Sequence, residues 1–424
     1  MKSKNNIQRI VKSLVLASTL GLSSVVSAGE VEVLHFWTSG GEAKSAAALK
    51  ELLEAKGHQW RDFAVAGGGG DAAMTVLKSR AVAGNPPTAA QVKGPSIQEW
   101  GNEGVLANVS AVAAEGDWDN LLPSVVANVM KYEGDYVAAP VNVHRVNWLW
   151  ANPAVFEQAG AALPNTWDEF FDAADKIKAA GLIPFAHGGQ PWQDFTVFES
   201  IVLGTGGADL YNKVFVELDE ASMKSDGMKK SFEILRRLND YTDAGSPGRD
   251  WNVATGMVIE GKAAMQVMGD WAKGEFTNAG KMPGKDFVCM AAPGTADAFT
   301  FNIDSFIFFD QSDSGARDAQ NALAATIMEP EFQQVFNVAK GSIPARLNMP
   351  REPFDACALT SMDDFVKTAE TGGLVPSVAH GMAAYSAVAG AMSDVVTKFF
   401  NSDMSAEDAV AAYVTNVMEA KASL

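Results

Sequence analysis

The stretch VLHFWTSGGE places aromatic rings next to hydrogen-bonding groups. Its first half alternates like a strand, and Phe36 and Trp37 stand where that strand ends. Gly40 and Gly41 allow close approach of the backbone at the start of a helix, whose first N–H groups are free donors. Glu42 adds a carboxylate acceptor. Together these groups can stack on a small ligand and hydrogen-bond it.

The stretch FNIDSFIFF offers a second set of hydrogen-bonding groups. On a strand, Asn302 and Asp304 share one face, and Phe306 and Phe308 follow on that face. The other face is apolar too, so the strand is expected to be buried on both sides, where an aspartate is costly without a partner. An amide and a carboxylate at this spacing can hydrogen-bond neighbouring hydroxyl groups of one ligand. The alternative is a structural Asp304 that caps a helix or pairs with an arginine.

Several single residues are weaker candidates for ligand binding when each is considered alone. Lys93 ends an expected strand, Lys340 precedes GSIPAR, and His380 lies in VPSVAHG. A lone lysine is usually solvated surface. Trp192 and Trp251 are second-tier candidates, because large tryptophans more often pack in cores or interfaces.

The elements that must position these residues alternate between strands and helices. Apolar alternation predicts strands over 30–37, 61–66 and 88–93, and helical periodicity predicts helices over 42–57 and 72–84, the second capped by Asp71. This order is typical of a parallel α/β sheet, whose ligand sites lie at the carboxyl ends of its strands. Trp37, Glu42 and Lys93 fall at that edge.

A similar alternation resumes after about residue 140, which makes two α/β lobes the natural interpretation. Its segments cover residues 138–152, 181–189 and 261–271, followed by a strand over 300–309 and a long helical stretch over 314–340. Helices are expected near 383–400 and 406–421, the last capped by Ser405 with acids in its first turn. The chain therefore ends in a helical tail.

Residues 1–28 have the pattern of a secretory signal. A basic start without acids precedes an apolar run that ends in VVSA before Gly29. A membrane anchor is the alternative, but a spanning helix needs about 20 apolar residues, and this run is shorter and interrupted by serines. We expect cleavage after Ala28 and export to the periplasm.

Length and charge narrow the class of protein. A chain of 424 residues suits two or three domains beside the signal. The formal net charge is −18 at pH 7. Phosphate backbones and anionic lipid surfaces would repel such a chain, which argues against nucleic-acid and membrane-surface roles.

Cys289 and Cys357 are the two cysteines of the chain. In a chain bound for an oxidising compartment, an even count favours one disulfide over two free thiols. The five histidines are scattered, and none stands at ligand spacing from a cysteine or another histidine. A metal site is therefore the poorer interpretation.

Four segments together resemble a known family: HFWTSGGE at 35–42, EGKAAMQVMGDW at 260–271, FNIDSF at 301–306 and KGSIPAR at 340–346. They look like extracellular solute-binding proteins of ABC transporters, and among these the monosaccharide (glucose or galactose) binders. The likeness spans nearly the whole mature chain. One departure is Phe36, where the family pattern has a second tryptophan.

The resemblance implies an α/β, two-lobe periplasmic-binding-protein fold, similar to type II, with a multi-strand hinge. One lobe would be residues 29–139 plus 298–341, and the other 140–297 plus 342–424, so both cysteines fall in the second. The implied protein is a monomeric non-enzyme that binds a monosaccharide without a cofactor and delivers it to the membrane permease of an ABC importer. The resemblance also leaves room for presentation to a chemoreceptor.

The ligand residues implied by the resemblance combine rings with hydroxyl-binding groups. A pyranose has a C–H face that suits an aromatic ring, and hydroxyls that need donors and acceptors. Trp37 and Trp271 would supply rings from the two lobes. The full predicted set is Trp37, Glu42, Lys93, Trp271, Asn302, Asp304, Lys340 and His380.

A secreted glycoside hydrolase that uses Glu42 and Asp304 is the serious alternative. Such an enzyme needs one carboxyl of raised pKa, whereas Lys93 and Lys340 would lower carboxyl pKa values. AGGGGDAA formally fits a dinucleotide fingerprint, but the acid expected about 20 residues later is missing. The chain has neither a Walker lysine after these glycines nor a G-x-S-x-G elbow.

Overall fold

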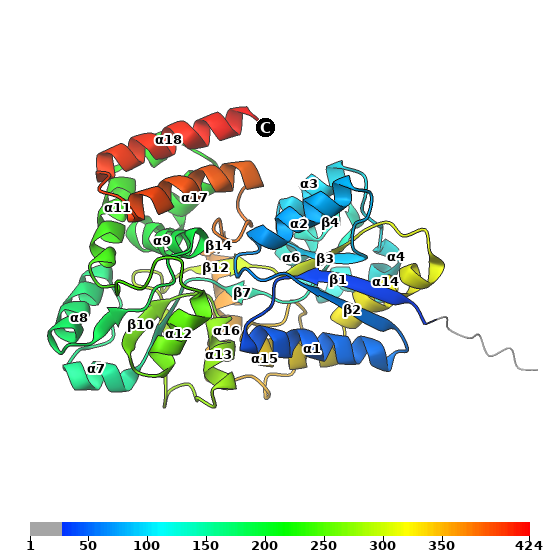
Figure 1. The fold of residues 1–424 in the computed structure, drawn as a ribbon, viewed down its shortest axis with the longest axis horizontal. Coiled ribbons are helices and arrows are strands. Elements are labelled where there is room, and N and C mark those ends of the chain that lie inside the picture. Colours follow the sequence, from blue (N-terminus) through cyan, green and yellow to red (C-terminus); the bar gives the residue numbers. More distant parts are fainter. Residues whose placement is uncertain (1–27) are drawn as a thin grey trace, which may run out of the picture.

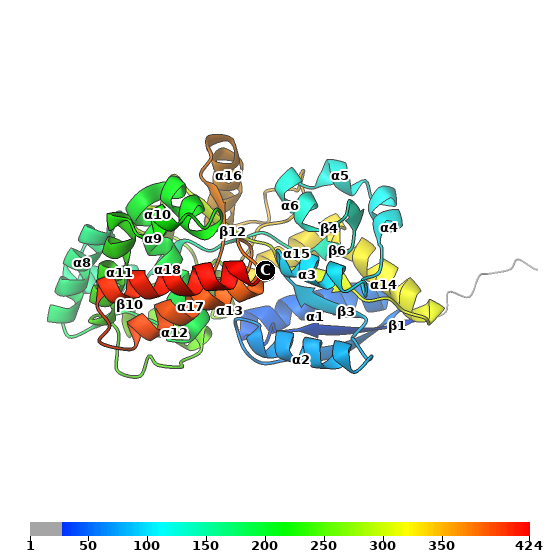
Figure 2. The same ribbon diagram turned by 90° about the horizontal axis from the view of Figure 1, so that it is seen from above.

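The computed structural model describes residues 28–424, which form two α/β lobes side by side (Figure 1 and Figure 2). Residues 1–27, nearly all of the predicted signal, lie outside the described residues. What we call the first lobe has a five-stranded sheet of order β2-β1-β3-β13-β6. Its strands are β1 (Glu30–His35), β2 (Gln59–Ala64), β3 (Ala89–Val92), β6 (Ala138–Pro140) and β13 (Ser305–Phe308).

Helices pack around this sheet. In α1 the predicted stripe of Ala46, Leu49 and Leu53 is buried, and Ser39 and Glu42 form a capping box at its start. The helices of the first lobe are α1 (Gly40–Ala55), α2 (Asp71–Val82), α3 (Ser96–Asn102), α4 (Ser110–Glu115), α5 (Trp118–Leu121), α6 (Ser124–Val129), α14 (Ser314–Ile327) and α15 (Pro330–Lys340). A two-stranded hairpin of β4 (Lys131–Tyr132) and β5 (Asp135–Tyr136) completes the first lobe.

The second lobe has a four-stranded sheet of order β11-β8-β10-β9. Its strands are β8 (Trp148–Ala151), β9 (Ile183–Phe185), β10 (Ala263–Val267) and β11 (Val288–Ala291). Its helices are α7 (Pro153–Ala159), α8 (Trp167–Ala179), α9 (Pro191–Phe215), α10 (Glu220–Met223), α11 (Asp226–Asn239), α12 (Trp251–Ile259), α13 (Ala272–Asn278), α17 (Ser386–Phe400) and α18 (Ala406–Ala422). The predicted C-terminal helices are confirmed, with Ser405 capping α18.

A third sheet, β14-β12-β7, lies between the lobes (Figure 1). It consists of β7 (His144–Arg145), β12 (Phe299–Asn302) and β14 (Leu374–Pro376), with α16 (Ala356–Thr371) packed against it. The chain leaves or enters the first lobe at three places, near residues 141–143, 303–304 and 341–343. Backbone hydrogen bonds connect these three segments. Val141 donates its N–H to the Asp304 carbonyl, and Val143 exchanges backbone hydrogen bonds with Ile343. We call this junction the hinge.

Three sequence predictions need correction. The predicted strand over 300–309 is two strands in different sheets, because the chain leaves β12 at Ile303 and joins β13 after Asp304. The helical stretch over 314–340 is two helices, since Pro330 lacks an N–H and starts α15. Asp71 is not the cap of α2 but its first helical residue, because Gly70 takes the cap position with φ of 91°.

The predicted disulfide is present. Cys289 on β11 bonds to Cys357 at the start of α16, with the two Cα atoms 6.1 Å apart. It ties the edge of the four-stranded sheet to the helix that packs on the hinge sheet. The covalent link therefore joins two segments that are 68 residues apart in the sequence.

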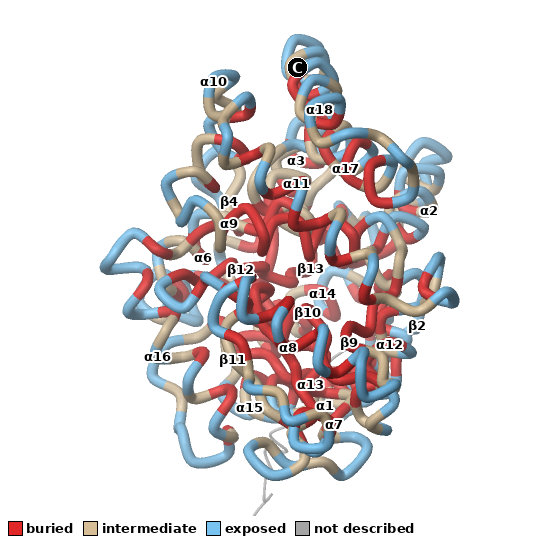
Figure 3. Tube along the Cα trace, turned by 90° about the vertical axis from the view of Figure 1, so that its left-hand side faces the viewer, coloured by how far each residue is buried: buried red, intermediate tan, exposed pale blue. Residues whose placement is uncertain are grey.

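The buried segments are concentrated inside both lobes and around the hinge, while exposed turns and helix faces surround them (Figure 3). Most of the largest fully buried side chains are aromatic. Within residues 28–424, every helix is too short or too polar to cross a bilayer.

Candidate functional site

A small cavity lies where the two lobes meet at the hinge, and all eight predicted ligand residues line it. Four further residues complete the lining: Phe36, Gly68, His144 and Trp251. The first lobe and the hinge supply the charged groups, while the second lobe supplies Trp251, Trp271 and His380. Residues far apart in the sequence thus converge on one place.

Asp304 is the centre of a charged network at the hinge. Its side chain accepts a hydrogen bond from Nε2 of His144 at 3.0 Å and lies 3.9 Å from Nζ of Lys93. Burial alone would raise the pKa of Asp304, but the charges of His144, Lys93 and Lys340 outweigh it and hold that pKa well below its ordinary value. Asp304 is therefore an ionised acceptor, which is unsuited to act as a general acid.

His144 joins two buried carboxylates. Its Nδ1 bonds to Asp270, which follows β10, and its Nε2 bonds to Asp304. Burial would lower the pKa of His144, but the two carboxylates outweigh it and raise that pKa. The two ring nitrogens thus contact one carboxylate each, and the ring links the second lobe to the segment that carries Asp304.

Lys340 and Glu42 form a buried ion pair. Nζ of Lys340 lies 2.7 Å from Oε1 of Glu42. The other oxygen of Glu42 accepts the N–H groups of Thr38 and Ser39 as part of the capping box of α1. Glu42 is thus largely occupied by protein donors, and it fixes the ammonium group of Lys340 at the cavity wall.

The predicted aromatic rings differ in their surroundings. Trp37 packs edge-on against Phe306 in the first-lobe core, with the ring centres 5.5 Å apart. Trp271 lies against His380, with ring centres at 4.9 Å. Phe36, which stands where the family pattern has tryptophan, carries the Lys93 ammonium 5.0 Å above its ring. This position therefore contributes a cation–π contact as well as a flat surface.

Gly41 corrects one sequence expectation. The N–H group at the start of α1 was expected to be free for a ligand, but it donates to Oε1 of Glu275 on α13 at 2.8 Å. A Cβ on Gly41 would lie 2.9 Å from the carbonyl carbon of Gly274. The glycines at this turn therefore allow α1 to approach α13 of the opposite lobe.

The glycine run at 67–70 also makes a contact between the lobes. A Cβ on Gly68 would lie 2.7 Å from the Trp251 ring, and one on Gly69 would lie 2.7 Å from the Trp192 ring. Gly70 has φ of 91°, which side chains rarely adopt, and it adjoins Phe36. The run lets a first-lobe turn close against two second-lobe tryptophans.

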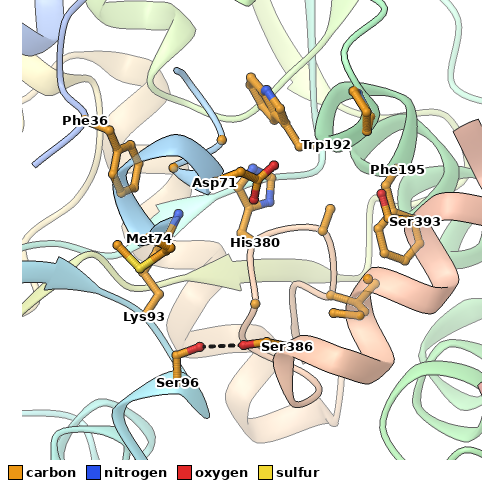
Figure 4. A pocket seen from close by; sticks show the side chains of 18 of the residues that line it. Phe36, Asp71, Met74, Lys93, Ser96, Trp192, Phe195, His380, Ser386 and Ser393 are labelled. Atoms are coloured by element: carbon orange, nitrogen blue, oxygen red, sulfur yellow. Dashed lines mark hydrogen bonds between the residues drawn. The ribbon is translucent and has the colours of Figure 1, made fainter. Parts of the chain in front are cut away.

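A larger cavity of about 370 Å³ adjoins the small one and shares Phe36, Lys93 and His380 with it. Figure 4 shows His380 and Trp192 on one side of this cavity, with Phe36 and Lys93 opposite them. Ser96 on α3 hydrogen-bonds Ser386 on α17 across the interface between the lobes. This cavity is therefore also bounded by both lobes.

Two residues that line the small cavity, His144 and Trp251, are absent from the predicted ligand set. His144 lies on a two-residue strand, and its sequence neighbours give no sign that two distant aspartates meet it. The glycine run was the available signal for Trp251, because small residues in series permit a close ring contact. Within residues 28–424, acidic, histidine and cysteine side chains do not gather into a group that could hold a metal ion.

Comparisons with known proteins agree with this architecture. The family profile described as "Bacterial extracellular solute-binding protein" matches residues 38–319. A "Probable sugar-binding periplasmic protein" of Brucella suis biovar 1 (strain 1330) is 49% identical over 404 residues, which are 95% of this chain and 96% of the relative.

Solved structures show the same fold at low sequence identity. A "Chitin oligosaccharide binding protein" has a TM-score of 0.79 at 18% identity, over 93% of this chain and 99% of that chain. The solute receptor AcbH, described as having an exclusive preference for β-D-galactopyranose, has a TM-score of 0.76 at 18% identity, again over 93% and 99%. The resemblance drawn from the sequence is confirmed, and the chain belongs to the bacterial extracellular solute-binding protein family.

Proposed function

We propose that this chain is the periplasmic sugar-binding component of an ABC importer and that it holds one monosaccharide of the glucose or galactose class between its lobes. The family membership and the name of the 49%-identical relative support sugar binding. The two structural neighbours are described as binding a single galactopyranose and an oligosaccharide, so the fold itself leaves the ligand length open. The site residues carry the finer proposal.

The observation that carries the proposal is a pair of unsatisfied polar atoms in the small cavity. Oδ1 of Asn302 and Nε2 of His380 are buried, and neither has a hydrogen-bond partner among residues 28–424. Buried polar groups are normally paired, so unpaired ones at a cavity suggest a ligand. Asn302 and His380 line the small cavity together with Asp304 and Trp271. This combination fits sugar hydroxyls and a C–H face.

The size of the cavity supports a hinged mechanism. Its volume in this arrangement is about 20 Å³, which is little more than one water molecule needs on this scale. A pyranose can enter only when the lobes part. We therefore propose hinge opening and closure, with residues 29–139 plus 298–341 moving against residues 140–297 plus 342–424. Strand β12 lies at the boundary of that division, because it belongs to 298–341 but pairs with β7 and β14 of the other part, so the motion must pivot after it.

The remaining parts of the proposal concern export and partners. Cleavage after Ala28 would release the chain into the periplasm as a monomer, and N-terminal sequencing of exported protein should return Gly29. A sequence that starts at Met1 would contradict the proposed processing. The loaded protein would deliver its sugar to the permease, and presentation to a chemoreceptor remains an additional proposal.

We propose that the chain is not an enzyme. The pKa of Asp304 is lowered, and Glu42 is paired with Lys340, so the pair lacks the protonated acid that glycoside hydrolysis requires. Incubation with aryl glycosides and disaccharides should release no product above the buffer rate. Release that disappears in Asp304→Asn would instead support the hydrolase.

A thermal-shift panel of D-glucose, D-galactose, D-mannose and maltose tests the proposed ligand class. A ligand at 100 times its Kd stabilises the protein by about 2.7 kcal/mol, which raises the Tm by a few degrees in a chain of this size. At least one hexose should raise the Tm at submillimolar concentration. A shift with maltose alone would favour an oligosaccharide in the combined cavities.

A further inference from the structure

Glu199 is a buried carboxylate outside the lining of both cavities. It lies on α9 with no exposed surface. One oxygen, Oε1, contacts Oγ of Ser377 at 2.7 Å. The other, Oε2, accepts from the backbone N–H groups of Val378 and Ala379 and lies 2.8 Å from the Tyr211 hydroxyl, which also lies 2.8 Å from the Pro376 carbonyl oxygen. The Ser377 hydroxyl at Oε1 and the two backbone N–H groups at Oε2 fit a carboxylate that only accepts hydrogen bonds.

Because Glu199 can only accept hydrogen bonds, it determines which atom is the donor between Ser377 and His380. The Ser377 hydroxyl has one proton, and it must donate that proton to Glu199 because the carboxylate has none to give. Nδ1 of His380 lies 2.9 Å from the same hydroxyl oxygen. Since the hydroxyl proton is used, Nδ1 must donate to Ser377. The ring proton of neutral His380 is then on Nδ1, and Nε2 has a free lone pair.

Nε2 is the ring nitrogen of His380 that Ser377 leaves without a partner among the described residues. His380 is buried and lines both cavities, and the centre of its ring lies 4.9 Å from that of Trp271 and 5.8 Å from that of Trp192. Nε2 is buried and has no hydrogen-bond partner among residues 28–424. Burial lowers the pKa of His380, and although Glu199 acts in the opposite direction, the net pKa lies below the ordinary histidine value, which favours the neutral ring at pH 7.

We propose that Glu199 is a positioning residue that fixes the tautomer of His380 through Ser377, so that Nε2 is presented to the ligand as a hydrogen-bond acceptor. The part that concerns the ligand rests on the proposed function. A sugar would have to direct a hydroxyl proton at this point. An analogue with fluorine there would bind less tightly, because fluorine cannot donate a hydrogen bond.

Glu199→Gln reverses this relay without changing the shape of the side chain. Its amide oxygen should face the two backbone N–H groups of Val378 and Ala379, which leaves the NH2 group to donate to Ser377. The Ser377 proton then turns to Nδ1, and the ring proton of His380 moves to Nε2. Asp194→Asn is a matched control, because Asp194 is a second fully buried carboxylate on α9 and pairs with His187 outside both cavities.

The test is nitrogen NMR of the His380 ring in the sugar-free full chain, followed by calorimetry with D-glucose and D-galactose. We expect an unprotonated Nε2 in the wild type and in Asp194→Asn, and a protonated Nε2 in Glu199→Gln. Affinity for the bound hexose should fall about threefold to tenfold in Glu199→Gln alone, as expected for one neutral hydrogen bond. If Glu199→Gln does not fold, Ser377→Ala should give a mixture of tautomers.

Each contrary result has a distinct meaning. A protonated Nε2 in the wild type, or the same tautomer in Glu199→Gln and the wild type, overturns the relay. A changed tautomer with unchanged hexose affinity overturns the role of Nε2 toward the ligand. A wild type with the expected tautomer that binds neither hexose supports the relay and contradicts the monosaccharide proposal.

Discussion

Oδ2 of Asp304 and Nε2 of His144 lie 3.0 Å apart, fully buried at the hinge. The same imidazole ring also bonds to Asp270 in the second lobe. Asp304 therefore has a charged protein partner in addition to any ligand hydroxyl. Removing Asp304 is therefore expected to lower the stability of the sugar-free protein as well as its affinity for a ligand.

We predict that Asp304→Asn loses both affinity and stability. Removing charge-assisted hydrogen bonds worth about 1.5 to 3 kcal/mol each should weaken hexose binding about tenfold to more than a hundredfold. It also leaves the His144–Asp270 pair without its second carboxylate, and breaking a buried ion pair typically costs about 3 to 5 kcal/mol. Calorimetry and urea unfolding measure the two effects. Asp194→Asn should lower stability alone, and an Asp304→Asn protein of wild-type affinity would remove Asp304 from the site.

His144 should make the folding stability depend on pH. Its pKa is raised in the folded chain, so its contribution is complete below the ordinary histidine pKa of about 6.5 and decreases as pH rises toward the folded-state value. The slope should approach 1.4 kcal/mol per pH unit, an order-of-magnitude value for one proton. The lowered pKa of His380 affects the folding stability only below about pH 6.5, outside the range in which His144 acts. Urea unfolding between pH 6.5 and 8 should show the slope in the wild type and not in His144→Gln; equal slopes would contradict the assignment.

Gly69→Ala should hinder closure of the lobes. Its Cβ would lie 2.7 Å from the Trp192 ring of the opposite lobe, so the closed form pays a steric cost that the open form avoids. Small-angle scattering with saturating hexose should show a larger radius of gyration than the liganded wild type, and affinity should fall at least tenfold. Gly256→Ala on α12 is the control, because its Cβ would meet nothing within 4 Å. Identical scattering and affinity in the two variants would count against a closing contact at Gly69.

The disulfide should contribute to stability without changing the site. Closing a loop of 68 residues stabilises by about 4 kcal/mol in the chain-entropy model. The double variant Cys289→Ser with Cys357→Ser should therefore unfold at lower urea concentration and bind hexose with nearly unchanged affinity. Two thiols that react with Ellman's reagent in the denatured, unreduced wild type would refute the bond.

Local sequence patterns predicted a helix or strand correctly where the feature depends on neighbouring residues alone. The buried stripe of α1 and the Ser405 cap of α18 follow from periodicity and capping chemistry. The strand over 300–309 failed because its apolar pattern is the same on both sides of Ile303, whereas the change of sheet depends on pairing with distant strands. Such pairing leaves no trace in the local sequence.

In the candidate site too, the sequence indicated single residues but not their distant partners. Single-residue chemistry and the family resemblance indicated residues that the fold places around one cavity. Partners were not predictable, because the contact of His144 with Asp270 and the relay from Glu199 to His380 join segments more than 100 residues apart. The free N–H expected at Gly41 was wrong for the same reason, since Glu275 comes from the opposite lobe.

The most direct test of monosaccharide binding is isothermal calorimetry of the exported protein with D-glucose, D-galactose, D-mannose and maltose, beside Asp304→Asn under the same conditions. The account predicts saturable binding of at least one hexose at one site per chain, weakened about tenfold or more in Asp304→Asn. Binding of maltose without any hexose, or equal hexose affinity in the two proteins, would contradict it.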